Sequence, residues 1–298
     1  MLTRRDWLAL AASGLVSVSD FSLLQAQEKP KQKKRLLMFT KSSGFEHSVI
    51  RRPKPDQLSH AENIVTKLGE QYGFEVVCTK DGRVFIPEEI AKYDAFFFYT
   101  TGDLTQPGTD KYPPMSPAGK KALLEAIQQG KGFIGSHCAA DTFHSPGRRD
   151  ENQPPEQRDP YIVMLGGEFI VHGAQQKARM QVVSRPFPAL KNLEDFVLYE
   201  EWYALKNFAP DLHVILVQDT TGMQGAMYQR PPFPATWARY HGQGRVFYTS
   251  MGHREDVWTN GIFQKLLVSG ILWALRELDG EIKPNLHQVT PKASVLRT

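Results

Sequence analysis

The chain has 298 residues, of which 41% are hydrophobic, 23% are charged and 11% are aromatic. These values are ordinary for a globular protein and exclude a disordered, collagen-like or polytopic membrane chain. The net charge of +4 is too small to indicate nucleic-acid binding, which needs a clustered basic stripe. The two cysteines, Cys78 and Cys138, exclude a disulfide scaffold and a zinc-finger framework.

Residues 1–27 have the pattern of a targeting segment. Arg4 and Arg5 precede the apolar stretch 8–18, which at 11 residues is too short to span a bilayer. We predict a twin-arginine signal that exports the folded protein to the periplasm or the exterior and leaves no membrane anchor. An ordinary amphipathic N-terminus is the alternative. Residues 28–34 follow as a basic linker.

The first half of the mature chain alternates short apolar runs with helical patterns. Strands are expected over 35–40, 74–79, 93–100 and 132–136, and helices over 55–69 and 116–129. Continuous apolar strands that alternate with helices predict a parallel sheet covered by helices on both faces.

The second half is less regular. Its expected elements are a surface loop over 145–160, an antiparallel strand over 176–184, a buried strand over 212–218, a hairpin of strands 235–240 and 245–250, a last helix capped by Thr259, and a polar tail over 279–298. We find no internal repeat and no linker composition within 35–278, which predicts one domain there.

Polar side chains follow many of the predicted strands. In an open parallel sheet, ligands bind beyond the carboxyl ends of the strands, so these positions mark the candidate site. A single histidine there is more often structural, but four on one rim with carboxylates between them favour function. The residues concerned are His47, Asp103, His137, Asp141, His172, Glu201 and His253.

The sequence GSHCA after the predicted strand 132–136 resembles a nucleophile elbow, in which a strand turns sharply into a helix with small neighbours. His137 is expected at the tip of the turn, and a helix behind it would keep the imidazole neutral. Cys138 is expected to turn into the scaffold as an inert thiol. A reactive Cys138 is the second interpretation, and a plain strand–helix turn is the third.

Two further groups have more than one interpretation. Glu200 and Glu201 are adjacent, so in an extended chain only one of them faces the crevice; a solvated pair is equally compatible. Trp202, Tyr203 and Trp237 would suit a stacking surface for a sugar ring, while core packing explains each of them equally well.

The same rim is a candidate metal site. The imidazoles of His47, His137, His172 and His253, with Asp103 or Glu201, offer nitrogen and oxygen ligands suited to zinc or a similar divalent metal. This metal is the one candidate cofactor. Hydrogen bonding among the histidines is the alternative.

Seven segments in order resemble the trehalose-utilisation (ThuA-like) family over about residues 35–275. They are KSSGFEH, YDAFFFYTTGDL, GKGFIGSHCAADTF, LGGEFIVH, EEWYAL, PATWARYHGQGRVFYTSMGH and FQKLLVSGILWAL. The family is similar in fold to class I glutamine amidotransferases, so the resemblance implies a flavodoxin-like three-layer α/β sandwich with a mostly parallel central sheet. Those relatives carry a cysteine at the elbow tip, where this chain has His137, so we expect no amidotransferase activity.

The resemblance also implies a role in carbohydrate catabolism, particularly of disaccharides oxidised to 3-keto-glycosides. We expect a hydrolase, lyase or isomerase that binds a small carbohydrate and removes the acidic proton beside the ketone. A non-catalytic carbohydrate-binding or accessory protein is the alternative. The roles assigned are base or metal ligand for His137 and His253, acid or base for Glu201, and substrate binding for His47, Asp103, Asp141, Trp202, Tyr203 and Trp237.

The targeting prediction can be tested directly. Changing Arg4 and Arg5 to lysine should stop export of a folded reporter fused after Gln27, because the twin-arginine route reads that pair as an address. Export is measured by fractionating cells. Unchanged export of the double-lysine variant would contradict the assignment.

Overall fold

The computed structural model describes residues 32–184, 187, 188, 190 and 192–297. The segment Lys33–Thr298 forms one compact unit. The predicted targeting segment 1–27 and most of the predicted linker lie outside the described residues. In the described part of the chain, no helix has both the length and the apolar character needed to cross a membrane.

The centre of the fold is a nine-stranded sheet with the strand order β2-β1-β3-β4-β11-β10-β9-β6-β7. Its first five strands are parallel; four of them are nearly all buried, and the edge strand β2 is partly exposed. They are β2 (Glu75–Thr79), β1 (Arg35–Phe39), β3 (Ala95–Phe98), β4 (Gly132–Ser136) and β11 (Gly244–Thr249). The order reverses between β1 and β3, as in flavodoxin-like sheets. The predicted α/β fold with a mostly parallel central sheet is confirmed.

The remaining strands extend this sheet in antiparallel fashion. They are β10 (Phe233–His241), β9 (His213–Asp219), β6 (Gln176–Val182) and β7 (Phe196–Glu200). The predicted hairpin and the predicted antiparallel strand near residue 176 are confirmed. A separate two-stranded sheet pairs β5 (Glu168–His172) with β8 (Tyr203–Lys206). The sequence analysis did not predict β5, β7 or β8, because these short strands mix apolar and charged residues.

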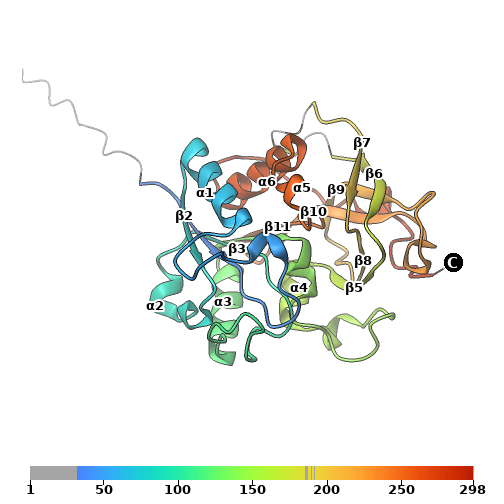
Figure 1. Cartoon of the computed structure of the whole chain (residues 1–298). Helices are drawn as coiled ribbons and strands as arrows, with labels where there is room; N and C mark the ends of the chain where they lie inside the picture. The colour runs from blue at the N-terminus through green and yellow to red at the C-terminus, as the bar shows by residue number, and fades with distance from the viewer. Residues whose placement is uncertain (1–31, 185–186, 189, 191, 298) are drawn as a thin grey trace, which may run out of the picture. The chain divides into compact units, whose positions relative to one another are not determined.

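Helices cover both faces of the sheet (Figure 1). One layer holds α1 (His60–Tyr72), α5 (Glu255–Trp258) and α6 (Gly261–Ala274), and the other holds α2 (Pro87–Ile90), α3 (Pro117–Gln128) and α4 (Pro160–Leu165). The short helix α7 (Leu286–Val289) lies in the tail against β9. Single 3-10 turns are η1 (Ser48–Ile50), η2 (Gly82–Val84), η3 (His137–Asp141), η4 (Pro155–Gln157) and η5 (Ala226–Tyr228).

Two helices begin later than the sequence predicted, and their caps explain why. Helix α1 begins after Ser59, whose hydroxyl accepts from the Glu62 N–H while the Glu62 carboxylate accepts from the Ser59 N–H. The prediction that Thr259 caps α6 is wrong. The side-chain oxygen of Asn260 accepts from the first free N–H groups of that helix, and the Thr259 hydroxyl donates instead to the Asp256 carbonyl.

Helix α6 packs on the sheet through a glycine. A Cβ at Gly270 would lie 2.4–2.6 Å from ring carbons of the buried Phe247 on β11, so only glycine allows the helix to approach this closely. This contact holds the layer of α1, α5 and α6 against the parallel strands.

Replacing Gly270 by alanine should therefore destabilise the protein by about 1–3 kcal/mol, because the added methyl overpacks the core. The free energy of unfolding is measured by denaturant titration. Gly261→Ala, at the first position of the same helix with no atom within 4 Å of the new Cβ, is the matched control. It should leave stability unchanged or raise it by up to ~1 kcal/mol. Equal effects of the two variants would contradict this account of the packing.

Candidate functional site

Three histidines and one glutamate meet beyond the carboxyl ends of the strands. His47 follows β1, His137 follows β4, His253 follows β11 and Glu201 follows β7. One possible ligand atom from each of the four lies within 4.8 Å of the other three. The three imidazole rings are 5.1–5.2 Å apart between centroids, at interplanar angles of 72–88°. We refer to these four residues as the His–Glu cluster.

His137 occupies the predicted tip of the elbow. Its φ of 45° is in the left-handed region, which residues other than glycine rarely adopt. The five-residue 3-10 turn η3 follows it, in place of the predicted α-helix. Its Nδ1 lies 2.9 Å from the Ser250 carbonyl oxygen, so Nδ1 carries a hydrogen, and in the neutral ring Nε2 presents a lone pair. That Nε2 is 3.3 Å from His253 Nδ1 and 3.4 Å from Glu201 Oε1.

Cys138 is not one of the residues that form the cluster. Its side chain is fully buried, and burial raises the pKa of the thiol well above its ordinary value. A thiol that stays protonated is a weak nucleophile. The placement agrees with an inert Cys138.

Only one of the two adjacent glutamates faces the cluster. Glu201 Oε1 lies 3.1 Å from His253 Nδ1. Glu200 is fully buried beside it, and its carboxylate accepts hydrogen bonds from the N–H groups of Glu201 (2.7 Å), Gly252 (2.9 Å) and His253 (3.1 Å). Burial raises the pKa of Glu200. The sequence analysis did not predict that Glu200 joins the end of β7 to the turn after β11 through these hydrogen bonds. The adjacency of two acidic residues could have suggested different roles for them.

The contact between Glu200 and Gly252 requires a curled sheet. Glu200 ends β7, which is the fourth strand beyond β11 in the sheet order. In a flat sheet four strand spacings would separate them by about 19 Å. The antiparallel strands therefore curl back and bring the end of β7 to the end of β11.

The electrostatics of the cluster suit a cation. Burial alone would raise the pKa of Glu201, but the neighbouring imidazoles of His137 and His253 lower it far below its ordinary value. Burial and then the neighbouring imidazoles hold the pKa of His47 well below its ordinary value, so that ring is neutral. His47 Nδ1 is buried without a hydrogen-bond partner among the described residues. The four side chains could hold a divalent metal.

His172 lies beside the cluster and contacts it through Glu201. Its Nδ1 is 3.3 Å from Glu201 Oε2 and 3.0 Å from the Gly173 carbonyl oxygen, and its side chain is 44% exposed. We predicted His172 as a metal ligand. In the structure it contacts Glu201 Oε2, whereas His137 and His253 contact Oε1. The cluster gathers the other three predicted histidines.

A β-bulge aims His172 at Glu201. The pairing of β5 with β8 shifts register between Phe169 and Val171. As a result Phe169 and His172 both contact the ring of Tyr203, at centroid distances of 4.1 and 6.0 Å. Bulges re-aim side chains in this way beside active sites.

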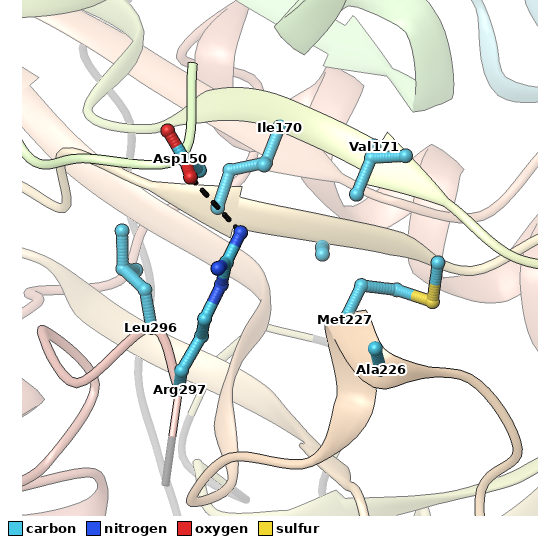
Figure 2. Close-up of a pocket in the computed structure, with 8 residues that line it drawn as sticks. Asp150, Ile170, Val171, Ala226, Met227, Leu296 and Arg297 are labelled. Atoms are coloured by element: carbon cyan, nitrogen blue, oxygen red, sulfur yellow. Dashed lines mark hydrogen bonds and ion pairs between the residues drawn. The ribbon is translucent and has the colours of Figure 1, made fainter. Parts of the chain in front are cut away.

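The opposite face of this small sheet borders a separate pocket of about 350 Å³. Figure 2 shows the pocket, with the ion pair of Asp150 and Arg297 among its lining residues. Val171 and Ala204 line it, whereas their neighbours His172 and Tyr203 face the cluster. The pocket is therefore distinct from the His–Glu cluster.

The two predicted aspartates are engaged elsewhere. Asp103 is exposed and accepts hydrogen bonds from the backbone N–H and hydroxyl of Thr105, which closes a turn. Asp141 pairs with His144 Nε2 at 2.8 Å and with Arg149 at 3.2 Å. The structure brings neither into contact with the cluster.

The predicted aromatic residues are buried. Trp202 and Trp237 have no exposed surface, and their indole N–H groups donate to the carbonyls of Gln176 and Leu165. Tyr203 is 2% exposed and packs at 4.0 Å between centroids against His137. These rings belong to the core, where Tyr203 packs against the imidazole of His137.

A hydrogen bond ties the loop of His47 to the loop of His253. The Ser48 hydroxyl, directly after His47, donates to the Glu255 carboxylate, and His60 Nε2 lies 3.1 Å from the Glu255 carbonyl oxygen. The two histidines therefore sit on mutually braced segments.

Comparison with known proteins places the chain in a family. A family model described as trehalose utilisation (ThuA) matches residues 35–274. A solved ThuA-like protein from Bacteroides uniformis is 20% identical, with a TM-score of 0.58 over 83% of this chain and 93% of that one. Another, from Parabacteroides merdae, is 17% identical, with a TM-score of 0.57 over 84% and 93%. No curated protein matches the chain.

At these identities the two solved structures bear on the fold alone. The family model, in contrast, spans most of the chain. The chain therefore belongs to the trehalose-utilisation (ThuA) family, which gives it a carbohydrate-related function.

Proposed function

We propose that the chain is an exported, metal-assisted enzyme of carbohydrate catabolism that acts on glycosides oxidised to 3-keto-glycosides. The observation that carries the proposal is the convergence of three imidazoles and one carboxylate, with ligand atoms within 4.8 Å of one another. Donors of this type and number suit zinc or a similar divalent metal. The Arg4–Arg5 pair supports export.

The arrangement of hydrogens in the cluster favours a bound cation. His137 presents the lone pair of Nε2 because its Nδ1 donates to the Ser250 carbonyl, which is the usual support of a metal-binding histidine. The neutral His47 contributes a buried nitrogen that no described residue satisfies. Glu201 is held as a carboxylate. A divalent cation would satisfy these lone pairs together.

The chemistry follows from the substrate class. A ketone at C3 acidifies the neighbouring C–H bonds, so a base can remove a proton if the enolate oxygen is held. A bound divalent metal would supply Lewis-acid polarisation of the ketone. Return of the proton to the ring gives isomerisation, and expulsion of the glycosidic oxygen gives elimination.

His172 is the residue best placed to accept that proton. Its Nδ1 faces the carbonyl oxygen of Gly173 and the carboxylate of Glu201, so Nδ1 carries the hydrogen and Nε2 is the accepting atom. The half-exposed ring is open to substrate, whereas the rings of His47 and His137 are buried. Glu201 positions His172, and its lowered pKa makes it a poor proton donor.

Metal content is the first test. The purified protein, supplied with zinc, should carry about one divalent ion per chain by elemental analysis and lose it to a chelator. His137→Ala should abolish binding because it removes a central ligand. His287→Ala, an exposed histidine on α7, is the control and should retain the metal. A wild-type protein that takes up no divalent metal would refute the metal site.

Turnover of 3-keto-trehalose separates the roles of the side chains. His172→Ala should lower the rate by about 10²–10⁴-fold while the metal stays bound, as expected for loss of a general base. His137→Ala should lose both the metal and the activity, and Cys138→Ser should stay within a few-fold of wild type.

Inactivation by Cys138→Ser or by a thiol alkylator would restore a cysteine-nucleophile mechanism. If metal-loaded protein binds the sugar but turns over no keto-glycoside, the non-catalytic carbohydrate-binding alternative holds.

A further inference from the structure

One large apolar side chain beside the His–Glu cluster is exposed. Phe45 has 67% of its surface in solvent, the highest value for a large hydrophobic residue in the described part of the chain. Its ring centroid is 5.0 Å from that of His47, at an interplanar angle of 88°. Because His47 is buried and Phe45 is exposed, the phenyl ring lies on the outer side of the cluster.

The backbone that carries Phe45 is fixed. The Thr101 hydroxyl donates to the Phe45 carbonyl at 2.9 Å and accepts from the Gly44 N–H at 3.2 Å. The Thr109 hydroxyl donates to the Gly44 carbonyl at 2.6 Å. The exposure of Phe45 is therefore a feature of an anchored loop.

A glycine allows this anchorage. Gly102 has a φ of 74°, and a Cβ there would lie 2.9 Å from the backbone nitrogen of Gly44. A side chain at this position would push the loop after β1 away from the loop after β3. The close approach keeps Thr101 within reach of both Gly44 and Phe45.

The fold gains little from the phenyl ring, since most of it remains in water. Aromatic rings in binding sites instead bury their faces against the apolar part of a ligand. The other aromatic residues proposed for that purpose, Trp202, Tyr203 and Trp237, are buried and inaccessible. Among the described residues, Phe45 is thus the accessible aromatic ring in contact with the cluster.

We infer that Phe45 is the stacking surface for a pyranose ring of the substrate, and that the site selects cyclic sugars by covering their C–H face. This inference rests on the proposed function and identifies the part of the substrate that the site binds. A pyranose presents one or both faces as C–H groups, which pack on a phenyl ring without needing hydrogen bonds. Its hydroxyl and ketone oxygens then remain free for the polar cluster.

The experiment uses full-length metal-loaded protein with Phe45→Ala and Phe45→Trp. Calorimetry measures the Kd of trehalose, and steady-state kinetics measure KM and kcat for 3-keto-trehalose. Phe45→Ala should raise Kd and KM by about tenfold, the size expected for one lost aromatic contact, with kcat within a few-fold. Phe45→Trp should restore both constants. Metal content and thermal stability should be unchanged.

Tyr72→Ala is the matched control. Tyr72 is also an exposed aromatic residue, at 46%, but it ends α1, which leads into β2 at the opposite, amino-terminal edge of the parallel strands. This variant should leave all sugar constants unchanged.

The outcomes separate this inference from the proposed function. Unchanged Kd and KM in Phe45→Ala, or no binding of trehalose to wild type, would overturn the stacking role whatever the metal and His172 results. A changed oligomeric state with unchanged sugar affinity would also overturn it. Tenfold weaker trehalose binding without turnover by the wild type would support Phe45 stacking and refute the enzyme.

Discussion

The carboxylate of Glu200 is the contact on which the site depends. It is fully buried, and three backbone N–H groups stabilise it. A buried carboxylate that lost these donors would be strongly unfavourable, so the end of β7 and the turn after β11 are held together. Because Glu200 faces the backbone, Glu201 faces the cluster. The antiparallel extension thereby supplies the carboxylate of the His–Glu cluster, whose three histidines follow strands of the parallel half.

The sequence predicted those features that depend on local pattern. Apolar runs located the parallel strands, and small residues around His137 identified the elbow tip. The orientation of Glu201 could not be predicted, because it depends on where β7 ends and how the sheet curls. The position of His172 depends on a bulge in β5. A glycine within a strand often indicates a bulge, and β5 contains none, so the sequence gives no signal of it. Burial of Trp202 and Trp237 is a property of packing between distant segments, so composition could not decide it.

The site has a buried interior and an accessible edge. His47 and His137 are at most 3% exposed and are held by packing and by the Ser250 carbonyl, whereas His172 is open to solvent. Rigid, desolvated donors favour a defined ligand geometry, while a half-exposed imidazole can exchange protons with water. The elbow, which serves a nucleophile in related folds, here presents an imidazole nitrogen, and the neighbouring thiol fills space in the core.

The left-handed backbone of His137 has a consequence for any attempt to engineer the protein. A non-glycine residue in this conformation costs about 1–2 kcal/mol, whereas glycine adopts it freely. Glycine at position 137 would relieve this strain, but it would also remove a fully buried ring that packs on Tyr203 and donates to the Ser250 carbonyl. The cavity left by such a ring costs about 2–5 kcal/mol, more than the strain that is relieved. Attempts to raise the melting temperature should therefore leave position 137 unchanged.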